Sequence, residues 1–233
     1  MVAAGIDFRL HPGERHALIG PNGAGKTTFV NLVTGRLAPS AGRVLLGGED
    51  VTRRAPVERV KRGLARTFQI NTQFMGLSVL ENVRLAIFER EGLAWRMFRP
   101  AESYRAVTGE ALAALEDLRL GPLAHRRVDE LAYGESRMVE VALALASRPS
   151  VLLLDEPAAG VPAEGSQAIL DQLARLPAHI AVMIIEHDMD LVFRFAQRVT
   201  VLDQGRVVAT GTPAEVQSDA HVRAIYFGER AHG

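Results

Sequence analysis

The sequence of 233 residues contains no cysteine, which excludes disulfide bonds and any chemistry that depends on a thiolate. It has no excess charge of either sign, because 27 lysines and arginines balance 27 aspartates and glutamates. This balance argues against a general attraction to nucleic acid, and we expect no nucleic-acid partner. The longest apolar runs, such as "IAVMII", are too short to cross a membrane, and the first residues lack the pattern of a signal peptide. We therefore expect a cytoplasmic protein.

Short aliphatic runs alternate with helical patterns along most of the chain, which predicts an α/β fold around a mainly parallel sheet. The clearest runs are "RHALIG", "SVLLLDEP" and "HIAVMIIEH", and each ends in polar residues. Ligands of open α/β sheets bind at that end of the strands, so we expect the chemistry to gather there. Two further segments, "GRVLLGG" and "RVTVLDQGRVVATG", have the pattern of antiparallel strands, the second as a hairpin turning at "DQG".

The middle of the chain, residues 77–147, contains no convincing strand, and its apolar residues recur at helical spacing. Ser78 with Glu81 and Thr212 with Glu215 have the spacing of capping boxes, which marks two helix starts. We therefore predict a helical subdomain inserted into a single α/β domain. The predicted limits are residues 71–147 for the helical subdomain and residues 1–70 and 148–233 for the α/β core.

A glycine-rich segment, "GPNGAGKTT", fits the pattern G-x-x-x-x-G-K-[ST] in full and lies between a predicted strand and a predicted helix. Its glycines let backbone N–H groups close around phosphate oxygens, and the helix that follows points its positive end at the same phosphates. Lys26 would neutralise the β and γ phosphates of a nucleoside triphosphate, and the Thr27 hydroxyl would bind Mg²⁺. The alternative is a glycine-rich turn without a ligand. The candidate phosphate-binding residues are Gly20, Pro21, Asn22, Gly23, Ala24, Gly25, Lys26, Thr27 and Thr28.

Two adjacent carboxylates, Asp155 and Glu156, end the apolar run "VLLL" before Pro157. Asp155 would hold Mg²⁺ through its water shell, and Glu156 would orient and deprotonate the attacking water. Gln69 and His187 also follow strand-like runs. Gln69 could bind the metal or the water, and His187 could donate a hydrogen bond to a γ-phosphate. Taken alone, each of these would be an ordinary polar residue on a solvated turn, and only the phosphate loop favours catalytic roles for them.

A second polar loop, "LAYGESR", precedes an apolar helical stretch. A helix that begins near Gly134 would present its N-terminus as a second anion site. Because the chain already has one phosphate loop, the second site is best explained as serving the nucleotide of a partner subunit. Two ATP molecules would then lie between the two subunits of a dimer. The candidate residues of this loop are Leu131, Ala132, Tyr133, Gly134 and Glu135.

The order of these motifs, phosphate loop, glutamine, "LAYGE", "DE" and histidine, resembles the ATP-binding cassette (ABC) ATPases over nearly the whole sequence. Within that superfamily, "ARTFQ", "LAYGESR", "LDEPAAG", "IEHDM" and the ending "YFGE" look most similar to the ATPase subunit of high-affinity branched-chain amino acid importers. The lipopolysaccharide-export ATPase is the nearest alternative, but its resemblance around "RTFQ" is weaker. The resemblance implies a P-loop NTPase core and ATP hydrolysis coupled to transport, with ATP and Mg²⁺ as cofactors.

The same resemblance implies partners and a place in the cell. A second, non-identical ABC ATPase would complete an ATP-sandwich dimer through the signature loop "LAYGE". Two membrane permeases would bind to the helical subdomain and to "INTQFMG", where Phe74 and Met75 would be packing anchors unless this loop is buried. Gln69 would link the nucleotide to the permeases, and His187 would respond to the γ-phosphate. A separate substrate-binding protein would choose the solute, and the ATPase would lie on the cytoplasmic face of the plasma membrane.

Three departures from the family pattern limit these implications. Ala132 stands where signature loops often have serine, and Pro162 stands where cassettes commonly have aspartate or asparagine. The usual opening strand and adenine-stacking aromatic residue would lie upstream of Met1. Other classes fit less well: a soluble cassette ATPase of DNA repair would need a long coiled coil, and one of translation normally has two cassettes. A P-loop kinase or GTPase would leave the second loop unexplained.

Overall fold

The computed structural model describes residues 3–67, 73–93 and 104–227, and its centre is a six-stranded sheet. The strand order is β4-β5-β6-β1-β7-β8. Neighbouring strands run parallel except β7 and β8, which form an antiparallel hairpin. The strands are β1 (Arg15–Ile19), β4 (Leu64–Arg66), β5 (Val151–Asp155), β6 (Ala181–Ile185), β7 (Arg198–Asp203) and β8 (Arg206–Gly211). The predicted α/β fold, its mainly parallel sheet and the hairpin at "DQG" are confirmed.

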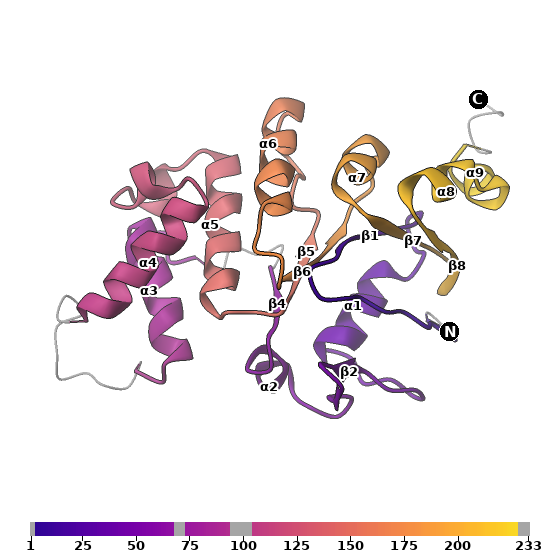
Figure 1. Cartoon of the computed structure of the whole chain (residues 1–233), viewed down its shortest axis with the longest axis horizontal. Helices are drawn as coiled ribbons and strands as arrows, with labels where there is room; N and C mark the ends of the chain where they lie inside the picture. The colour runs from indigo at the N-terminus through magenta and orange to yellow at the C-terminus, as the bar shows by residue number, and fades with distance from the viewer. Residues whose placement is uncertain (1–2, 68–72, 94–103, 228–233) are drawn as a thin grey trace.

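Helices cover both faces of this sheet, because each connection between parallel strands must return over one face. Helix α1 (Lys26–Thr34) lies on one face, and α6 (Ala163–Ala174) and α7 (Met189–Phe195) lie on the other (Figure 1). β1 and β6 are buried along their whole length between these layers. This burial explains the uninterrupted apolar run of β6, since a strand covered on both faces needs no polar alternation.

A small antiparallel hairpin lies outside the main sheet. β2 (Leu45–Leu46) pairs with β3 (Glu49–Asp50), and Gly47 and Gly48 between them have φ values of 57° and 84°. Two consecutive positive φ values are those of a type I′ turn, which favours glycine. The antiparallel prediction for "GRVLLGG" is confirmed, although only two of its residues form a strand. Helix α2 (Pro56–Val60) follows this hairpin, and α8 (Pro213–Ser218) and α9 (Ala220–Phe227) follow β8.

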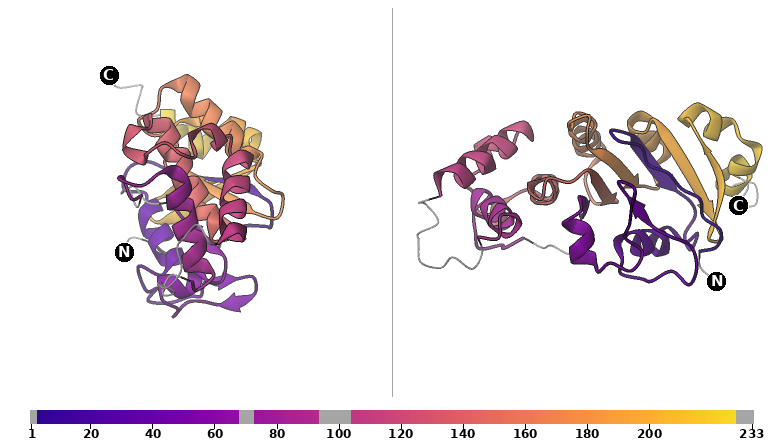
Figure 2. Two further views of the ribbon diagram at one scale, coloured as in Figure 1. Left: turned by 90° about the vertical axis from the view of Figure 1, so that its left-hand side faces the viewer. Right: turned by 60° about the horizontal axis from the view of Figure 1, so that its bottom comes forward.

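The middle of the chain forms a helical segment at the end of the molecule opposite α8 and α9 (Figure 1, Figure 2). Its helices are α3 (Val79–Arg90), α4 (Arg105–Asp117) and α5 (Tyr133–Ala146), with short 3₁₀ turns at Gly121–Leu123 and Val128–Glu130. No strand forms within the described residues 77–93 and 104–147, as the sequence predicted. α5 packs against α3 and α4 and also against β4 and α6, so the helical segment shares its apolar core with the sheet. The limits of the helical subdomain, 71–147, stay a prediction.

Both predicted capping boxes are present. Ser78 Oγ accepts from the Glu81 N–H at 3.2 Å, and the Glu81 carboxylate accepts from the Ser78 N–H at 2.7 Å. Thr212 and Glu215 form the same reciprocal pair, at 3.3 and 2.7 Å. Each box satisfies two backbone donors at a helix start, which fixes where α3 and α8 begin. The resulting helices are short: in the described part of the chain, none is long and apolar enough to cross a membrane.

The carboxyl ends of β1, β4, β5 and β6 meet at one edge of the sheet, since these strands are parallel neighbours. The residues that directly follow these four strands are Gly20, Thr67, Glu156 and Glu186. Segments that are far apart in the sequence therefore lie side by side, and the register pairs Asp155 with Ile185. Open α/β sheets bind their ligands at this edge.

Candidate functional site

The predicted phosphate loop connects β1 to α1 at this edge. Gly23 and Gly25 have φ values of 80° and 100°, in the left-handed region that favours glycine. A Cβ built on Gly20 would collide with the carbonyl oxygen of Leu202 on β7, so this position also requires glycine. Helix α1 begins at Lys26, directly after the loop. The loop therefore lies at the positive end of a helix, where unpaired N–H groups can bind an anion.

Lys26 places its ammonium group against the phosphate loop. Its Nζ donates to the carbonyl oxygens of Gly20, at 2.5 Å, and Pro21, at 3.1 Å. Burial lowers the pKa of Lys26, while the charges of Glu156 and Asp155 act in the opposite direction. These interactions show that the loop and the carboxylate pair are neighbours. A cation is thus available where the phosphates of a nucleotide would develop charge.

Asp155 ends β5 and is held by an arginine on the neighbouring strand β4. Arg66 Nη2 lies 2.8 Å from Asp155 Oδ2, and both side chains are 10% exposed. Arg66 Nη1 donates to Asn31 Oδ1 on α1 at 3.0 Å. Arg66 therefore joins the carboxylate to the helix that follows the phosphate loop, and the ion pair uses one of the two oxygens of Asp155.

The residues predicted to bind magnesium fit a metal that is held mainly through a nucleotide. Mg²⁺ keeps several waters and takes one or two protein groups besides substrate phosphates. Asp155 at the strand end and the exposed Thr27 at the start of α1 belong to such a donor set. Within the described ranges, no group of three or more His, Cys, Asp or Glu side chains could hold a metal by itself. Gln69, the third predicted ligand, lies outside the described residues.

Glu156 and His187 follow neighbouring strands and lie close together. His187 Nδ1 is 3.8 Å from Glu156 Oε1, and the two side chains are 71% and 37% exposed, respectively, so both can reach a ligand. Glu156 has a φ of 48°, which is unusual for a residue with a side chain, and its N–H donates to the Ile185 carbonyl at 2.9 Å. Such backbone strain persists only where the surroundings enforce it, and it clusters at functional sites. The structure thus brings the predicted base and the predicted γ-phosphate contact together.

The second polar loop leads into α5, as the sequence predicted, and Gly134 lies in its first turn. Glu135 caps this helix, because its carboxylate accepts from the Ala132 N–H at 2.8 Å. Tyr133 is 50% exposed, and the Arg137 guanidinium lies 5.0 Å from the centre of its ring. Leu131 is half-buried against the apolar core. The loop therefore presents backbone N–H groups at a helix start, and Ala132 supplies no serine hydroxyl there.

Two contacts connect this loop to neighbouring segments of the chain. Gln73 Nε2 donates to the Ser136 carbonyl at 2.7 Å, and Ser136 Oγ donates to Gln73 Oε1 at 3.0 Å. A Cβ built on Gly160 would approach the Tyr133 ring at 3.1 Å, so the segment after the carboxylate pair packs against this ring. Pro162, the second departure from the family pattern, is the residue that precedes α6. The start of α5 therefore packs against Gln73 and against the segment around Gly160.

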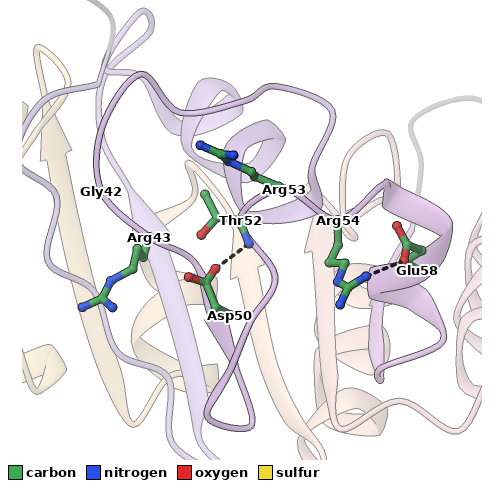
Figure 3. A pocket seen from close by; sticks show the side chains of 7 residues that line it. All are labelled: Gly42, Arg43, Asp50, Thr52, Arg53, Arg54 and Glu58. Atoms are coloured by element: carbon green, nitrogen blue, oxygen red, sulfur yellow. Dashed lines mark hydrogen bonds and ion pairs between the residues drawn. The ribbon is translucent and has the colours of Figure 1, made fainter.

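A shallow pocket beside β2 and β3 does not belong to this site. Its lining residues are Gly42, Arg43, Asp50, Thr52, Arg53, Arg54 and Glu58. The three arginines point in different directions and do not converge on one point (Figure 3). Arg54 lies 3.3 Å from Glu58, and Asp50 accepts from the Thr52 N–H at 2.9 Å. We therefore assign no ligand to this pocket.

Two charged residues of the site, the half-buried Arg66 and the buried Glu186, were not identified from the sequence. Arg66 binds Asp155, and Glu186 lies beside His187 with Oε2 3.9 Å from Nδ1. A signal existed for both, because each is a charged residue at the end of a strand-like run next to a predicted site residue. Charged residues are seldom buried unless they are paired, so a charged residue at such a position predicts a partner nearby.

A mainly parallel sheet with a phosphate loop, a carboxylate pair and a histidine along one edge defines a P-loop domain that binds nucleoside triphosphates. Comparison with protein families agrees with this class. Residues 3–159 match the ABC transporter family, and residues 206–232 match the family of branched-chain amino acid ATP-binding cassette transporters. The chain belongs to the ABC transporter family, and it is an ATP-binding and ATP-hydrolysing subunit of that family.

Individual proteins are similar along nearly the whole chain. The high-affinity branched-chain amino acid transport ATP-binding protein LivG of Escherichia coli is 36% identical over 96% of this chain and 91% of LivG. The corresponding BraF of Pseudomonas aeruginosa is 34% identical over 97% of this chain and 91% of BraF. The ADP conformation of MJ1267, an ATP-binding cassette of an ABC transporter, has a TM-score of 0.85 at 31% identity, with 97% of this chain and 92% of that one covered.

A dimeric cassette is also similar. MJ0796, a bacterial ABC transporter cassette with a dimeric structure, has a TM-score of 0.74 at 26% identity and covers 91% of this chain and 90% of its own. The predicted P-loop NTPase fold, the ABC resemblance and the ATPase activity are confirmed. Cassettes of this fold bind nucleotide and form dimers, and this chain is a subunit of a transporter.

Proposed function

We propose that this chain is the ATP-driven motor subunit of an importer for branched-chain amino acids or related small solutes. The observation that carries this proposal is the 36% identity to LivG over 96% of the chain. The match of residues 206–232 to the branched-chain family supports the substrate class separately, because these residues lie outside the part that matches ABC transporters in general. The edge of the sheet where β1, β4, β5 and β6 end, called the catalytic edge below, would carry out ATP hydrolysis. Permease subunits would form the path of the solute through the membrane.

Each residue of the catalytic edge has a proposed role. Backbone N–H groups of the phosphate loop and Lys26 hold the triphosphate, and Glu156 accepts a proton from the attacking water. His187, 3.8 Å from Glu156, donates to the γ-phosphate. Thr27, Asp155 and Gln69 would hold Mg²⁺, which neutralises charge on the β and γ phosphates when it is bound. Asp155 would keep its contact with Arg66 through Oδ2 and present Oδ1 to the metal's water shell.

The signature loop is proposed to bind the ATP of a second, non-identical cassette. Gly134→Asp tests this, because a carboxylate at the start of α5 would repel the partner's phosphates. The change should not unfold the chain: a Cβ at Gly134 would lie 3.7 Å from Val161 Cγ1, which is ordinary contact, and a carboxylate is favourable at a helix N-terminus. We expect ATP-dependent dimerisation, measured by analytical ultracentrifugation, to be lost. Gly109→Asp, in open space on α4, is the matched control and should dimerise normally.

A permease-docking surface is proposed at Phe74 and Met75. These side chains are 60% and 41% exposed, so the alternative of a buried loop is wrong for them. Asn82, which is 2% exposed, accepts from the Phe74 N–H at 2.8 Å and donates to the Phe74 carbonyl at 3.1 Å. Two apolar side chains are thus presented on a fixed backbone, which suits a permease helix. Binding there would hold the subunit on the cytoplasmic face of the plasma membrane, while a separate binding protein selects the solute.

Uptake measurements test the proposed substrate directly. In the native host, deletion of this gene should abolish high-affinity uptake of radiolabelled leucine, and the wild-type gene should restore it. The Glu156→Gln gene should not restore uptake, although its product should still associate with the permeases. Normal leucine uptake in the deletion strain would contradict the substrate, and leucine uptake supported by Glu156→Gln would contradict the motor role.

A further inference from the structure

Glu186 is a buried carboxylate at the carboxyl end of β6, directly before His187. It is 2% exposed. Its Oε1 accepts from the Ala158 N–H at 3.2 Å, and its Oε2 accepts from the His187 N–H at 3.3 Å. Burial raises the pKa of Glu186, and the two backbone hydrogen bonds act in the opposite direction. Burying a carboxylate in such a place costs stability, and the two hydrogen bonds from the loops beside the proposed catalytic residues offset that cost.

The two N–H groups that Glu186 binds belong to the loop that contains Glu156 and to the loop that contains His187. Ala158 lies two residues after Glu156, and His187 carries the imidazole itself. The His187 ring is 71% exposed, so packing around the ring does little to fix its place. Its position depends on its backbone, and that backbone is joined by Glu186 to the loop that begins at Glu156. The 3.8 Å separation between His187 Nδ1 and Glu156 Oε1 therefore depends on the Glu186 bridge as well as on the direct hydrogen bond from the Glu156 N–H to the Ile185 carbonyl.

We propose that Glu186 is a positioning residue that fixes His187 relative to Glu156 by joining the loops after β5 and β6 through two backbone hydrogen bonds. This inference rests on the roles proposed above for Glu156 and His187. Glu186 acts through His187 and does not touch the nucleotide. Glutamine has the same size but offers an acceptor to only one of the two N–H groups, because its NH₂ group faces the other. Glu186→Gln therefore keeps the volume of the side chain and breaks the bridge.

A purely structural carboxylate is present elsewhere in the chain and supplies a matched control. Glu14, 7% exposed, accepts from the His11 N–H at 2.9 Å, and its Oε1 lies 2.7 Å from His16 Nδ1. It directly precedes β1, at the opposite end of that strand from the phosphate loop. Glu14→Gln thus removes a buried charge with a similar set of partners, far from the catalytic edge.

The test is a double-mutant cycle on the purified full chain with ATP and Mg²⁺, measured as single-turnover hydrolysis of radiolabelled ATP. We expect Glu186→Gln to lower the rate about 10-fold to 100-fold, the effect of misplacing a positioned group, with ATP affinity changed less than about 3-fold. In a His187→Ala background the same substitution should change the rate by less than about 2-fold, because the residue that it positions is gone. Glu14→Gln should leave the rate unchanged in both backgrounds.

Three results would overturn the inference: a wild-type rate for Glu186→Gln, an equal loss in both backgrounds, or an equal loss for Glu14→Gln. Amide hydrogen exchange adds a readout that does not require hydrolysis. In Glu186→Gln we expect faster exchange at Ala158 or His187, and unchanged exchange at both would also overturn it. Failure of the proposed function has a different signature, because it would appear as normal hydrolysis by His187→Ala or Glu156→Gln alone.

Discussion

The two edges of the parallel sheet each carry a glutamate beside a histidine, and the two pairs are built in opposite ways. At the edge where β1 begins, His16 is 1% exposed, and its Nδ1 and Nε2 lie 2.7 Å from Glu14 and 2.8 Å from Thr200. At the edge where β6 ends, His187 is 71% exposed and lies 3.8 Å from Glu156. Both nitrogens of the first histidine are satisfied within the chain, whereas the second histidine is free to meet a ligand.

The groups around the two pairs also differ. Glu156 has a φ of 48° at the catalytic edge, and Lys26 is partly stripped of water beside two carboxylates. At the opposite edge the side chain of Thr200 hydrogen-bonds both His16 and Thr210, at 2.8 and 3.0 Å. One edge therefore uses polar residues to close the structure, and the other keeps strained and loosely paired groups available for chemistry. Substitutions should separate the two, with stability changing at one edge and turnover at the other.

The largest expected effect is on turnover at the catalytic edge. Glu156→Gln removes the proposed general base and keeps the phosphate loop, so we expect hydrolysis to fall by about 10²-fold to 10⁴-fold. ATP affinity should stay within a few-fold of wild type, because the side chain that changes does not hold the phosphates. Phosphate release in steady state and equilibrium binding of a fluorescent ATP analogue measure the two quantities. Unchanged turnover would mean that another group takes the proton.

The next effect changes both turnover and stability, because it lies where the loop meets the sheet. Gly20→Ala places a Cβ against the Leu202 carbonyl, and we expect unfolding free energy to fall by about 1–3 kcal/mol, with ATP binding lost. Urea unfolding and ATP titration measure this. Gly109→Ala, where nothing lies within 4 Å of the new Cβ, is the matched control and should stabilise the chain slightly. A Gly20→Ala protein that binds ATP normally would show that β7 can shift to accommodate the added methyl group.

At the opposite edge the expected effect is on stability alone. Thr200→Val keeps the shape of the side chain but leaves His16 Nε2 and the Thr210 hydroxyl without this partner. A buried polar group that loses its hydrogen bond costs about 1–3 kcal/mol, so urea unfolding should shift to lower concentration. Hydrolysis at a temperature where the variant is folded should match wild type. If turnover falls as well, the two edges are coupled through β7 and β1, and the contrast between them is weaker than we infer.

The sequence predicted most of the catalytic edge and almost none of its counterpart. "GPNGAGKTT", "LLLDEP" and "IIEHD" are local patterns at strand ends, so a parallel sheet brings them together without further information. The network of His16 depends on Thr200, which is 184 positions away, and on the register of β1 with β7. Register between distant strands has no local signature. Arg66 escaped notice for a similar reason, because its partner Asp155 is 89 positions away on the neighbouring strand.

The smallest effect is a pH dependence that His16 alone should produce. Burial lowers the pKa of His16 below 6.5, while Glu14 acts in the opposite direction without cancelling the burial. Between that lowered pKa and about 6.5 the unfolded chain binds more protons than the folded chain, so folded stability falls as the pH drops below about 6.5. His16→Gln removes this titration and can still face Glu14 and Thr200 with an amide.

Urea unfolding of wild type and His16→Gln at pH 8, 7, 6 and 5.5 isolates the effect, because Glu186 and the other titratable groups that do not contact His16 are common to both proteins. Wild type should lose its advantage over His16→Gln progressively at the acid end, and the difference should be constant between pH 7 and 8. An advantage that grows on acidification would mean that Glu14 holds His16 as an imidazolium ion. The opposite edge, where β1 begins, would then contain a buried ion pair. The two histidine–glutamate pairs would then differ only in how exposed they are.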